Sequence, residues 1–175
     1  MQYKEVILLK CGEIVLKGLN RSKFEQKLMD DVRRRLSPVG VYSLVSRQST
    51  IYVRPKDEAS AAAIDKALEA VKDVYGVAAL CKAAECPKNT DEIFKILPEY
   101  CRNELAKAKT FKVNAKRSDK NFPLTSPELA ALAGGVILSR FPRLKVDLDN
   151  PDVTVTIEIR ETDAYIHANR IPGAG

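Results

Sequence analysis

The sequence of 175 residues contains no tryptophan, one histidine and four cysteines. The cysteines are spread along the chain without a C-x-x-C pair, and only Cys81 and Cys86 lie close together. A structural zinc site needs four Cys or His ligands, usually as two close pairs, and the second pair is missing. We therefore expect no metal site and interpret the cysteines as buried, reduced thiols. They are Cys11, Cys81, Cys86 and Cys101.

The motifs of common catalytic sites are also missing. The sequence has no H-E-x-x-H, G-x-S-x-G, G-x-x-x-x-G-K-[ST] or G-x-G-x-x-G pattern. Its single histidine, His167, lies near the C-terminus and leaves few candidates for a general base at neutral pH. We therefore expect no catalytic residue and no cofactor in this chain, which lacks the residues of a complete enzyme.

Long hydrophobic runs are missing as well. The longest are Val6–Leu9, Ala59–Ile64 and Val77–Cys81, whereas a membrane-spanning helix needs about 18–20 apolar residues. The N-terminal apolar stretch is too short for a secretory signal. Hydrophobic residues nevertheless make up 45% of the chain, enough for a core. We expect a cytoplasmic protein that has no membrane partner.

The first half of the chain alternates between strand and helix patterns. Two helices are predicted, one from Asn20 or Ser22 to Leu36 and one from Asp57 to Tyr75. Around them, four strands are predicted at Lys4–Lys10, Val41–Val45, Thr50–Arg54 and Val77–Cys81. This order is that of a ferredoxin-like βαββαβ domain, in which two helices cover one face of an antiparallel sheet. We expect this domain to span residues 1–84.

Each of these helices has an apolar face that we expect to pack into the core. In the first helix the face consists of Phe24, Leu28, Val32 and Leu36. In the second it consists of Ile64, Leu68, Val71 and Tyr75.

The turn-rich segment CPKNT, residues 86–90, predicts a boundary before a second domain at residues 85–172. Thr90 is the expected cap of a helix in which Pro98 should cause a kink or an earlier split. A second helix is expected from a capping Ser126 to about Arg140, with Gly134 and Gly135 packed closely against another element. Strands are predicted at Thr110–Arg117, Lys145–Leu148, Val153–Ile159 and Ala164–Ala168. The last residues, 171–175, have a loop composition. The expected fold class is therefore α+β.

Basic residues are concentrated in two segments of a chain whose net charge is +6. Residues 10–35 contain eight basic and four acidic residues, and residues 109–120 contain five basic residues and one acidic residue. Basic segments on two modules suit a polyanion, because each phosphate contact releases counterions. Since the charge of the whole chain is mild, the alternative is a pair of solvated faces. Arg33, Arg34 and Arg35 are better explained as cations in the last turn of a helix.

The second basic segment has a geometry that suits RNA. On the strand at 110–117, Lys112, Asn114 and Lys116 share one face, and Phe111, Val113 and Ala115 share the other. The following polar loop adds Arg117, Lys120, Asn121 and Phe122. The cations can hold phosphates while Asn121 or Phe122 meets an unpaired base. The alternative for Phe122 is a core residue that closes the loop, and for His167 it is a structural role.

Three segments resemble one family of RNA-modifying enzymes. Residues 11–25, CGEIVLKGLNRSKFE, resemble the segment GE-x-x-LKG-x-NR-x-x-FE of tRNA 4-thiouridine synthetases, also called tRNA sulfurtransferases. Cys11 departs from the aromatic residue expected there. Residues 111–129, FKVNAKRSDKNFPLTSPEL, are similar to the THUMP signature F-x-V-x-x-[KR]-R-x-x-K-x-F-P-x-x-S-x-E. The ending IPGAG, residues 171–175, resembles the linker into that family's ATP-pyrophosphatase domain, so residues 173–175 are expected to start this linker.

This resemblance implies a ferredoxin-like domain followed by a THUMP domain that recognise the acceptor stem and 3′ end of tRNA. In the family, ATP with magnesium adenylates a uridine in a domain absent from this sequence. A persulfide sulfur from a cysteine desulfurase then replaces the activated oxygen. The family forms homodimers and is linked to synthesis of the thiamine thiazole. The adenylation motif SGG-x-DS is absent here, so we expect this chain to bind tRNA without catalysing the reaction.

The resemblance and the charge pattern together select candidate tRNA contacts. Phosphate contacts are expected from Lys112, Lys116, Arg117 and Lys120, and contacts to the RNA end from Asn121 and Phe122. The first domain is expected to add Lys17, Asn20 and Arg21, while Gly12 and Gly18 are better explained by turns. One alternative is the THUMP RNA-binding module of another RNA-modifying enzyme, such as a methylase. Another is a ferredoxin-like domain that binds a small molecule or a protein.

Overall fold

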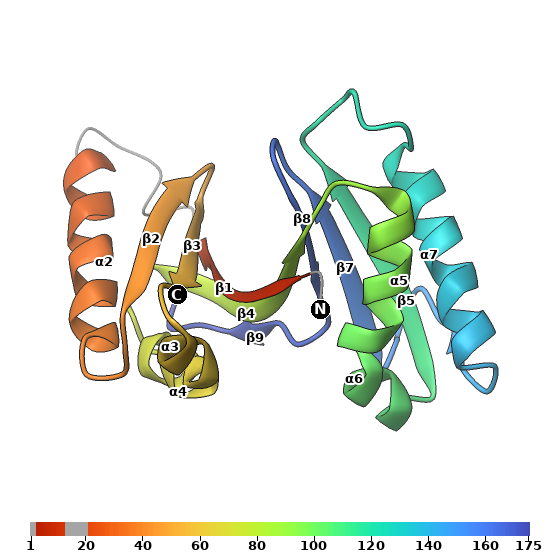
Figure 1. Ribbon diagram of the computed structural model, residues 1–175, viewed down its shortest axis with the longest axis horizontal. Coiled ribbons are helices and arrows are strands. Elements are labelled where there is room, and N and C mark those ends of the chain that lie inside the picture. The colour runs from red at the N-terminus through yellow and green to blue at the C-terminus, as the bar shows by residue number, and fades with distance from the viewer. Residues whose placement is uncertain (1–2, 13–20) are drawn as a thin grey trace. The chain divides into compact units, whose positions relative to one another are not determined.

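The computed structural model describes residues 3–12 and 21–175, which form two compact units (Figure 1). One unit contains the described residues of Glu5–Lys82 together with Arg170–Gly175. The other contains Ala83–Asn169 together with residues 3 and 4. Strand β4, Val77–Cys86, is divided between the two after Lys82. The domain bounds 1–84 and 85–172 stay predictions, and the candidates Lys17 and Asn20 lie outside the described residues.

The first unit has the element order of a ferredoxin-like domain. Its strands are β1 (Lys4–Cys11), β2 (Tyr42–Arg47), β3 (Thr50–Pro55) and the first part of β4, in the sheet order β2-β3-β1-β4. Its helices are α2 (Arg21–Leu36), α3 (Glu58–Ala62) and α4 (Ile64–Val71). The antiparallel pairing of β3 with both β1 and β2 places Ile51 and Val53 in the core. From the helices, Leu28, Val32, Leu36, Ile64, Ala67 and Val71 join this core.

Two predicted apolar positions of this unit are not in its core. Phe24, in the second turn of α2, remains 48% exposed. Tyr75 is 67% exposed because the helix begun at the Asp57 cap breaks at Ala63 and ends at Val71. The helical spacing therefore does not extend to Tyr75, and the prediction of a continuous apolar face was wrong for this residue.

The last residues form a strand where the sequence predicted a loop. Strand β9 (Ile171–Pro172) pairs with β4 in the antiparallel register Ala79 to Pro172 and Leu80 to Ile171. Gly173 lies so close to β4 that an added Cβ would be 2.1 Å from the carbonyl oxygen of Val77. Only glycine allows the backbone to approach this closely. Apart from Ile171 the segment has little strand propensity, so this strand depends on its pairing with β4.

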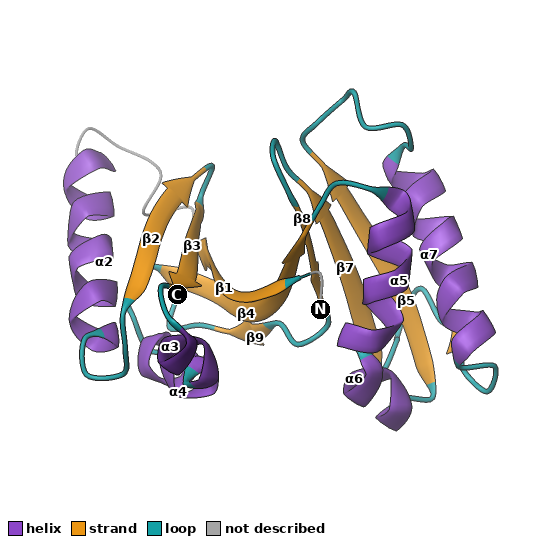
Figure 2. Ribbon diagram, in the orientation of Figure 1, coloured by secondary structure: helices purple, strands orange, loops and turns teal. Residues whose placement is uncertain are grey.

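The second unit has helices on one face of a mixed sheet (Figure 2). The helices are α5 (Thr90–Tyr100), α6 (Arg102–Lys107) and α7 (Ser126–Arg140). The strands are β5 (Thr110–Arg117), β6 (Lys145–Val146), β7 (Val153–Ile159), β8 (Ala164–His167) and the end of β4. They follow the order β4-β8-β7-β5-β6, and β5 is parallel to both of its neighbours. Phe111, Leu129, Ile137 and Ile157 are among the fully buried core residues.

The helix ends of this unit differ from their sequence predictions. The caps are Asn89 and Thr125, each one residue before the predicted Thr90 and Ser126. Both caps have the extended backbone that a capping residue needs, and their side chains accept from the backbone N–H three residues on. Thr125 and Glu128 form a complete capping box. Pro98 lies inside α5, and the break follows it at Cys101 rather than one turn earlier.

The glycine pair of α7 does not pack closely against another element. A Cβ added at Gly134 or Gly135 would meet nothing within 4 Å. The prediction of a close approach at this point was therefore wrong. The buried side of α7 is made by Leu129, Ala133 and Ile137 instead.

The four cysteines are free thiols, three of them buried and Cys11 half-buried. Burial raises the pKa of Cys86 to about 12 and that of Cys11 to about 11, which keeps these thiols protonated at neutral pH. No three metal-ligating side chains gather among residues 3–12 and 21–175. None of the helices described is long and apolar enough to span a membrane.

Candidate nucleic-acid interface

The strand β5 presents a polar strip on the face opposite the helices. The registers with β7 place Lys112 opposite Thr154, Asn114 opposite Thr156, and Lys116 opposite Glu158. Lys116 and Asn114 are exposed, and Lys112 is half-buried. Neither lysine forms an ion pair within the part of the chain that the structure describes. The alternation therefore gives β5 a strip of ammonium and amide groups, beside which β7 contributes Thr154 and the buried side chains of Thr156 and Glu158.

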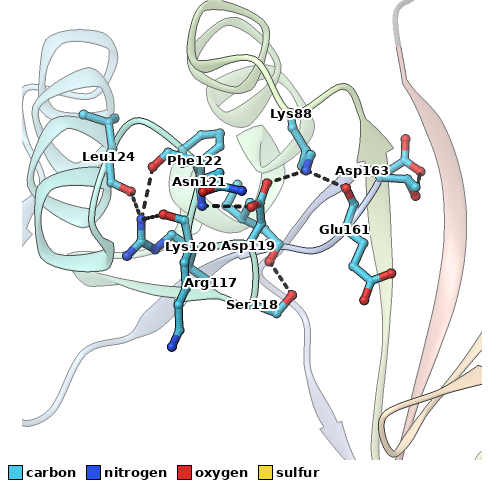
Figure 3. A network of polar contacts seen from close by, with 12 residues as sticks. Lys88, Arg117, Ser118, Asp119, Lys120, Asn121, Phe122, Leu124, Glu161 and Asp163 are labelled. Atoms are coloured by element: carbon cyan, nitrogen blue, oxygen red, sulfur yellow. Dashed lines mark hydrogen bonds and ion pairs between the residues drawn. The ribbon is translucent and has the colours of Figure 1, made fainter.

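The loop after β5 is organised around Arg117 (Figure 3). Its guanidinium donates from Nη1 to the carbonyl oxygens of Lys120, Phe122 and Leu124, at 3.4, 3.1 and 3.3 Å. A planar cation can satisfy several carbonyls of one turn at once. Arg117, predicted as a phosphate contact, therefore holds the loop that carries Lys120 and Asn121. Both of these residues are exposed.

This loop is also held by an ion pair between Asp119 and Lys88, which the sequence patterns did not predict. The Asp119 carboxylate accepts from Lys88 Nζ at 2.6 Å and from the backbone N–H of Asn121 at 2.9 Å. Lys88 also donates to the carbonyl oxygen of Glu161 at 2.5 Å, which ties the turn before α5 to two loops (Figure 3). The hydrogen bond from Lys88 is the main cause that lowers the pKa of Asp119. Lys88 and Asp119 are 31 positions apart, so no local pattern links them.

Phe122 does not present its ring to the surface. It is 5% exposed and belongs to the core of the second unit. Of the two interpretations of this residue, the structure therefore agrees with a core residue that closes the loop. Its carbonyl oxygen, bound by Arg117, helps to fix the loop that leads into α7.

The single histidine belongs to a buried polar group on the same sheet. His167 Nε2 lies 2.8 Å from Glu158 Oε2, and both side chains are almost fully buried. The other carboxylate oxygen of Glu158 accepts from Arg160. Both Glu158 oxygens are thus hydrogen-bonded, which offsets the cost of burying the carboxylate. The structure agrees with the structural role expected for His167.

In the first unit, Arg21 is exposed at the start of α2. It lines a cavity of about 300 Å³ together with Glu25 of α2, Arg47 at the end of β2, and Gln48 and Ser49 of the turn that follows. Gln48 and Ser49 have positive φ angles of 47° and 72°, which the hairpin geometry requires at both central positions. The described lining has two arginines against one carboxylate, that of Glu25, which makes the cavity a second candidate contact for a phosphate.

Arg33, Arg34 and Arg35 lie in the last turn of α2, as the sequence predicted. Arg33 pairs with Asp30 and Arg34 pairs with Asp31, each at 3.2 Å and within the same helix. These exposed pairs are local helix interactions of small energy.

The two candidate surfaces, the strip of β5 and the cavity at Arg21, both present cations and amides, which bind phosphates and base edges.

Comparison with protein families assigns a class to each unit. Residues 6–81 match the ThiI ferredoxin-like domain, and residues 87–168 match the THUMP domain. The chain is therefore a protein of the ferredoxin-like plus THUMP class, as the sequence predicted.

Similar proteins define the family more narrowly. The chain is 37% identical to a probable tRNA sulfurtransferase of Thermoanaerobacter pseudethanolicus, over 98% of this chain and 43% of that protein. Its fold matches PH1313 of Pyrococcus horikoshii with a TM-score of 0.83 and 30% identity, over 97% of this chain and 55% of the other. It matches a 4-thiouridine synthetase in complex with RNA and ATP with a TM-score of 0.82 and 26% identity, over 97% and 42% of the two chains.

The chain belongs to the tRNA sulfurtransferase family. It spans less than half the length of the curated relative compared above. The family resemblance and the α+β fold predicted from the sequence are confirmed by these matches.

Proposed function

We propose that this chain binds the acceptor stem and 3′ end of tRNA, as the RNA-binding part of an enzyme that makes 4-thiouridine. The observation that carries the proposal is the cationic strip of β5, continued by the loop that Arg117 holds in place. The similarity to a 4-thiouridine synthetase that was solved with RNA supports it.

Each part of this surface has a task that follows from its chemistry. Lys112, Lys116 and Lys120 supply positive charge for phosphates. Asn121, whose side chain offers both a donor and an acceptor, is suited to the edge of an unpaired base. Arg21, together with Lys17 and Asn20, is the proposed contribution of the first unit. Phe122 is no longer proposed as a stacking residue, because its ring is buried.

The chemistry of the whole protein is part of the same proposal. ATP with magnesium activates the uridine oxygen of tRNA in a domain that this sequence does not contain. Sulfur from a persulfide, supplied by a cysteine desulfurase, then replaces that oxygen. We propose further that the protein is a cytoplasmic homodimer with a role in thiamine thiazole synthesis. The alternative of a THUMP module from a methylase fits less well, because residues 6–81 match the ThiI ferredoxin-like domain.

A gel-shift titration tests the proposed function of this chain. The probes are unmodified tRNA and the same tRNA without its 3′ CCA, each at two salt concentrations. We expect intact tRNA to bind, added salt to weaken the complex, and removal of the CCA end to weaken it further. Equal binding of both probes would contradict end recognition, and no binding of either would contradict the proposed function.

A further inference from the structure

Two aromatic residues of the first unit are exposed although helical spacing assigned both to the core. Phe24 is 48% exposed and Tyr75 is 67% exposed. The other nine aromatic side chains of the protein are buried or half-buried. Large apolar surface left in water costs folding free energy. Positions where a sequence departs from its own folding pattern are often functional.

The two exposed aromatics line the same shallow groove. Phe24 comes from α2, and Tyr75 comes from the turn between α4 and β4. The groove has a volume of about 210 Å³ and is completed by Lys27, Leu28 and Asp31. Leu28 is almost fully buried and forms an apolar base, while Asp31 is paired with Arg34. Among the described lining residues Lys27 is the one cation, and it is exposed.

The size of the groove restricts what can occupy it. Its volume lies below the roughly 300–1,000 Å³ of sites for drug-sized ligands, which suits one flat ring system. A stable protein partner would need about 1,200–2,000 Å² of buried surface, and this groove provides a small part of that. Two aromatic side chains with an adjacent cation are the groups that bind unpaired bases of nucleic acids.

The charge of α2 favours a nucleic acid over a neutral partner. This helix contains six basic residues and three acidic ones. The acidic residues Asp30 and Asp31 are paired within the helix. A polyanion is therefore attracted to the surface that contains the groove.

We infer that an unpaired base of RNA stacks in this groove against Phe24 and Tyr75, with the Lys27 ammonium on an adjacent phosphate. The inference rests on the proposed function, because it adds a contact to the same RNA. It makes the first unit a base-binding module in its own right, in addition to a source of positive charge.

The absence of tryptophan allows a direct spectroscopic test. A Tyr75→Trp variant keeps a stacking ring and contains the only indole of the protein. We expect its fluorescence to be quenched when tRNA is added, because a stacked base quenches an indole. The matched control is Val41→Trp, which places the indole at an exposed position of the same unit outside the groove. Its fluorescence should change little at the same tRNA concentration.

Affinity measurements separate stacking from charge. Phe24→Ala and Tyr75→Ala should each weaken tRNA binding by about 5- to 150-fold without changing the dependence of log K on log salt. Lys27→Ala should reduce that slope by about 0.7. Both aromatic positions are exposed, so thermal unfolding should confirm that the variants fold.

The outcomes distinguish this inference from the proposed function. If the unchanged protein does not bind tRNA, the proposed function is wrong and the inference falls with it. If it binds with the expected salt dependence while the alanine variants bind equally well and Tyr75→Trp is not quenched at saturation, only the inference is overturned. In that second case the groove does not bind an RNA base.

Discussion

The guanidinium of Arg117 donates to the carbonyl oxygen of Phe122 at 3.1 Å. The sequence offered these two residues as separate contacts to RNA, a cation for phosphate and a ring for a base. In the structure they fix a loop together, the arginine by binding its carbonyls and the phenylalanine by burying its ring. The residues left to face a ligand are the lysines and asparagines of β5 and this loop. Lys116, Lys120, Asn114 and Asn121 are exposed, and Lys112 is half-buried.

Removal of the two β5 lysines tests the main RNA contact. We expect Lys112→Ala with Lys116→Ala to weaken tRNA binding and to lower the slope of log K against log salt by about 1.4–1.8. Lys95→Ala with Lys107→Ala is the matched control, because these exposed lysines lie on α5 and α6 in the helix layer. The measurement is a salt series of filter-binding titrations. An unchanged slope in the β5 variant would exclude this strip as a phosphate contact.

We expect Arg117 to contribute more to the stability of the loop at residues 118–124 than to the positive charge that binds RNA. Arg117→Lys keeps the positive charge but loses the planar group that reaches three carbonyls. We expect it to lower the free energy of unfolding by about 1–3 kcal/mol, measured by urea denaturation. Amide hydrogen exchange of residues 118–124 should also become faster.

Arg102→Lys serves as the control for this substitution, since Arg102 is exposed and pairs with Glu99 on the helix surface. An Arg117→Lys variant as stable as the unchanged protein would show that the carbonyl contacts contribute little.

The pair of Lys88 and Asp119 predicts a pH dependence of stability. The pKa of Asp119 lies below its ordinary value of 3.8 in the folded protein, chiefly because of the hydrogen bond from Lys88. The unfolded chain therefore binds the proton more readily, and the stabilisation is present above pH 3.8 and lost as the pH falls through the lowered pKa. We expect unchanged protein to be more stable than Asp119→Asn at neutral pH, with the difference closing in acid.

Urea denaturation at a series of pH values measures this difference. Asp73→Asn, at an exposed carboxylate of the other unit, provides the control. A gap between unchanged protein and Asp119→Asn that stays constant down to pH 2 would contradict the role given to the ion pair.

The open glycines of α7 predict a stabilising change. Alanine has a higher helix propensity than glycine, and its Cβ would meet no neighbour at Gly134 or Gly135. We expect Gly134→Ala and Gly135→Ala each to raise the free energy of unfolding by about 0.5–1 kcal/mol. Thermal unfolding measures this as a rise in Tm of a few degrees.

Gly173→Ala is the contrasting variant, because its Cβ would be 2.1 Å from a backbone oxygen of β4. We expect it to lower the stability of the first unit. Loss of stability in the α7 variants would contradict the open space found around Gly134 and Gly135.

Local sequence patterns were sufficient to predict the helices and strands and the fold class. The alternation of Phe111, Val113 and Ala115 with Lys112, Asn114 and Lys116 predicted β5 and the side that faces the core. Side-chain direction in a strand repeats every two residues whatever lies nearby. The order of strands and helices then limited the first half to a ferredoxin-like arrangement. The long segments of resemblance supplied the family.

The tertiary structure decided which side chains are buried and which of them pair with each other. Phe24 and Tyr75 have helical spacing, but a residue is buried only if another element lies opposite it, which the sequence does not record. The pairing of Lys88 with Asp119, and of His167 with Glu158, joins positions that come together only in the folded units. Residues 171–172 became a strand because β4 offered unpaired backbone groups. The sequence determined the elements and their charges, and the tertiary structure decided which of those charges and rings face a ligand.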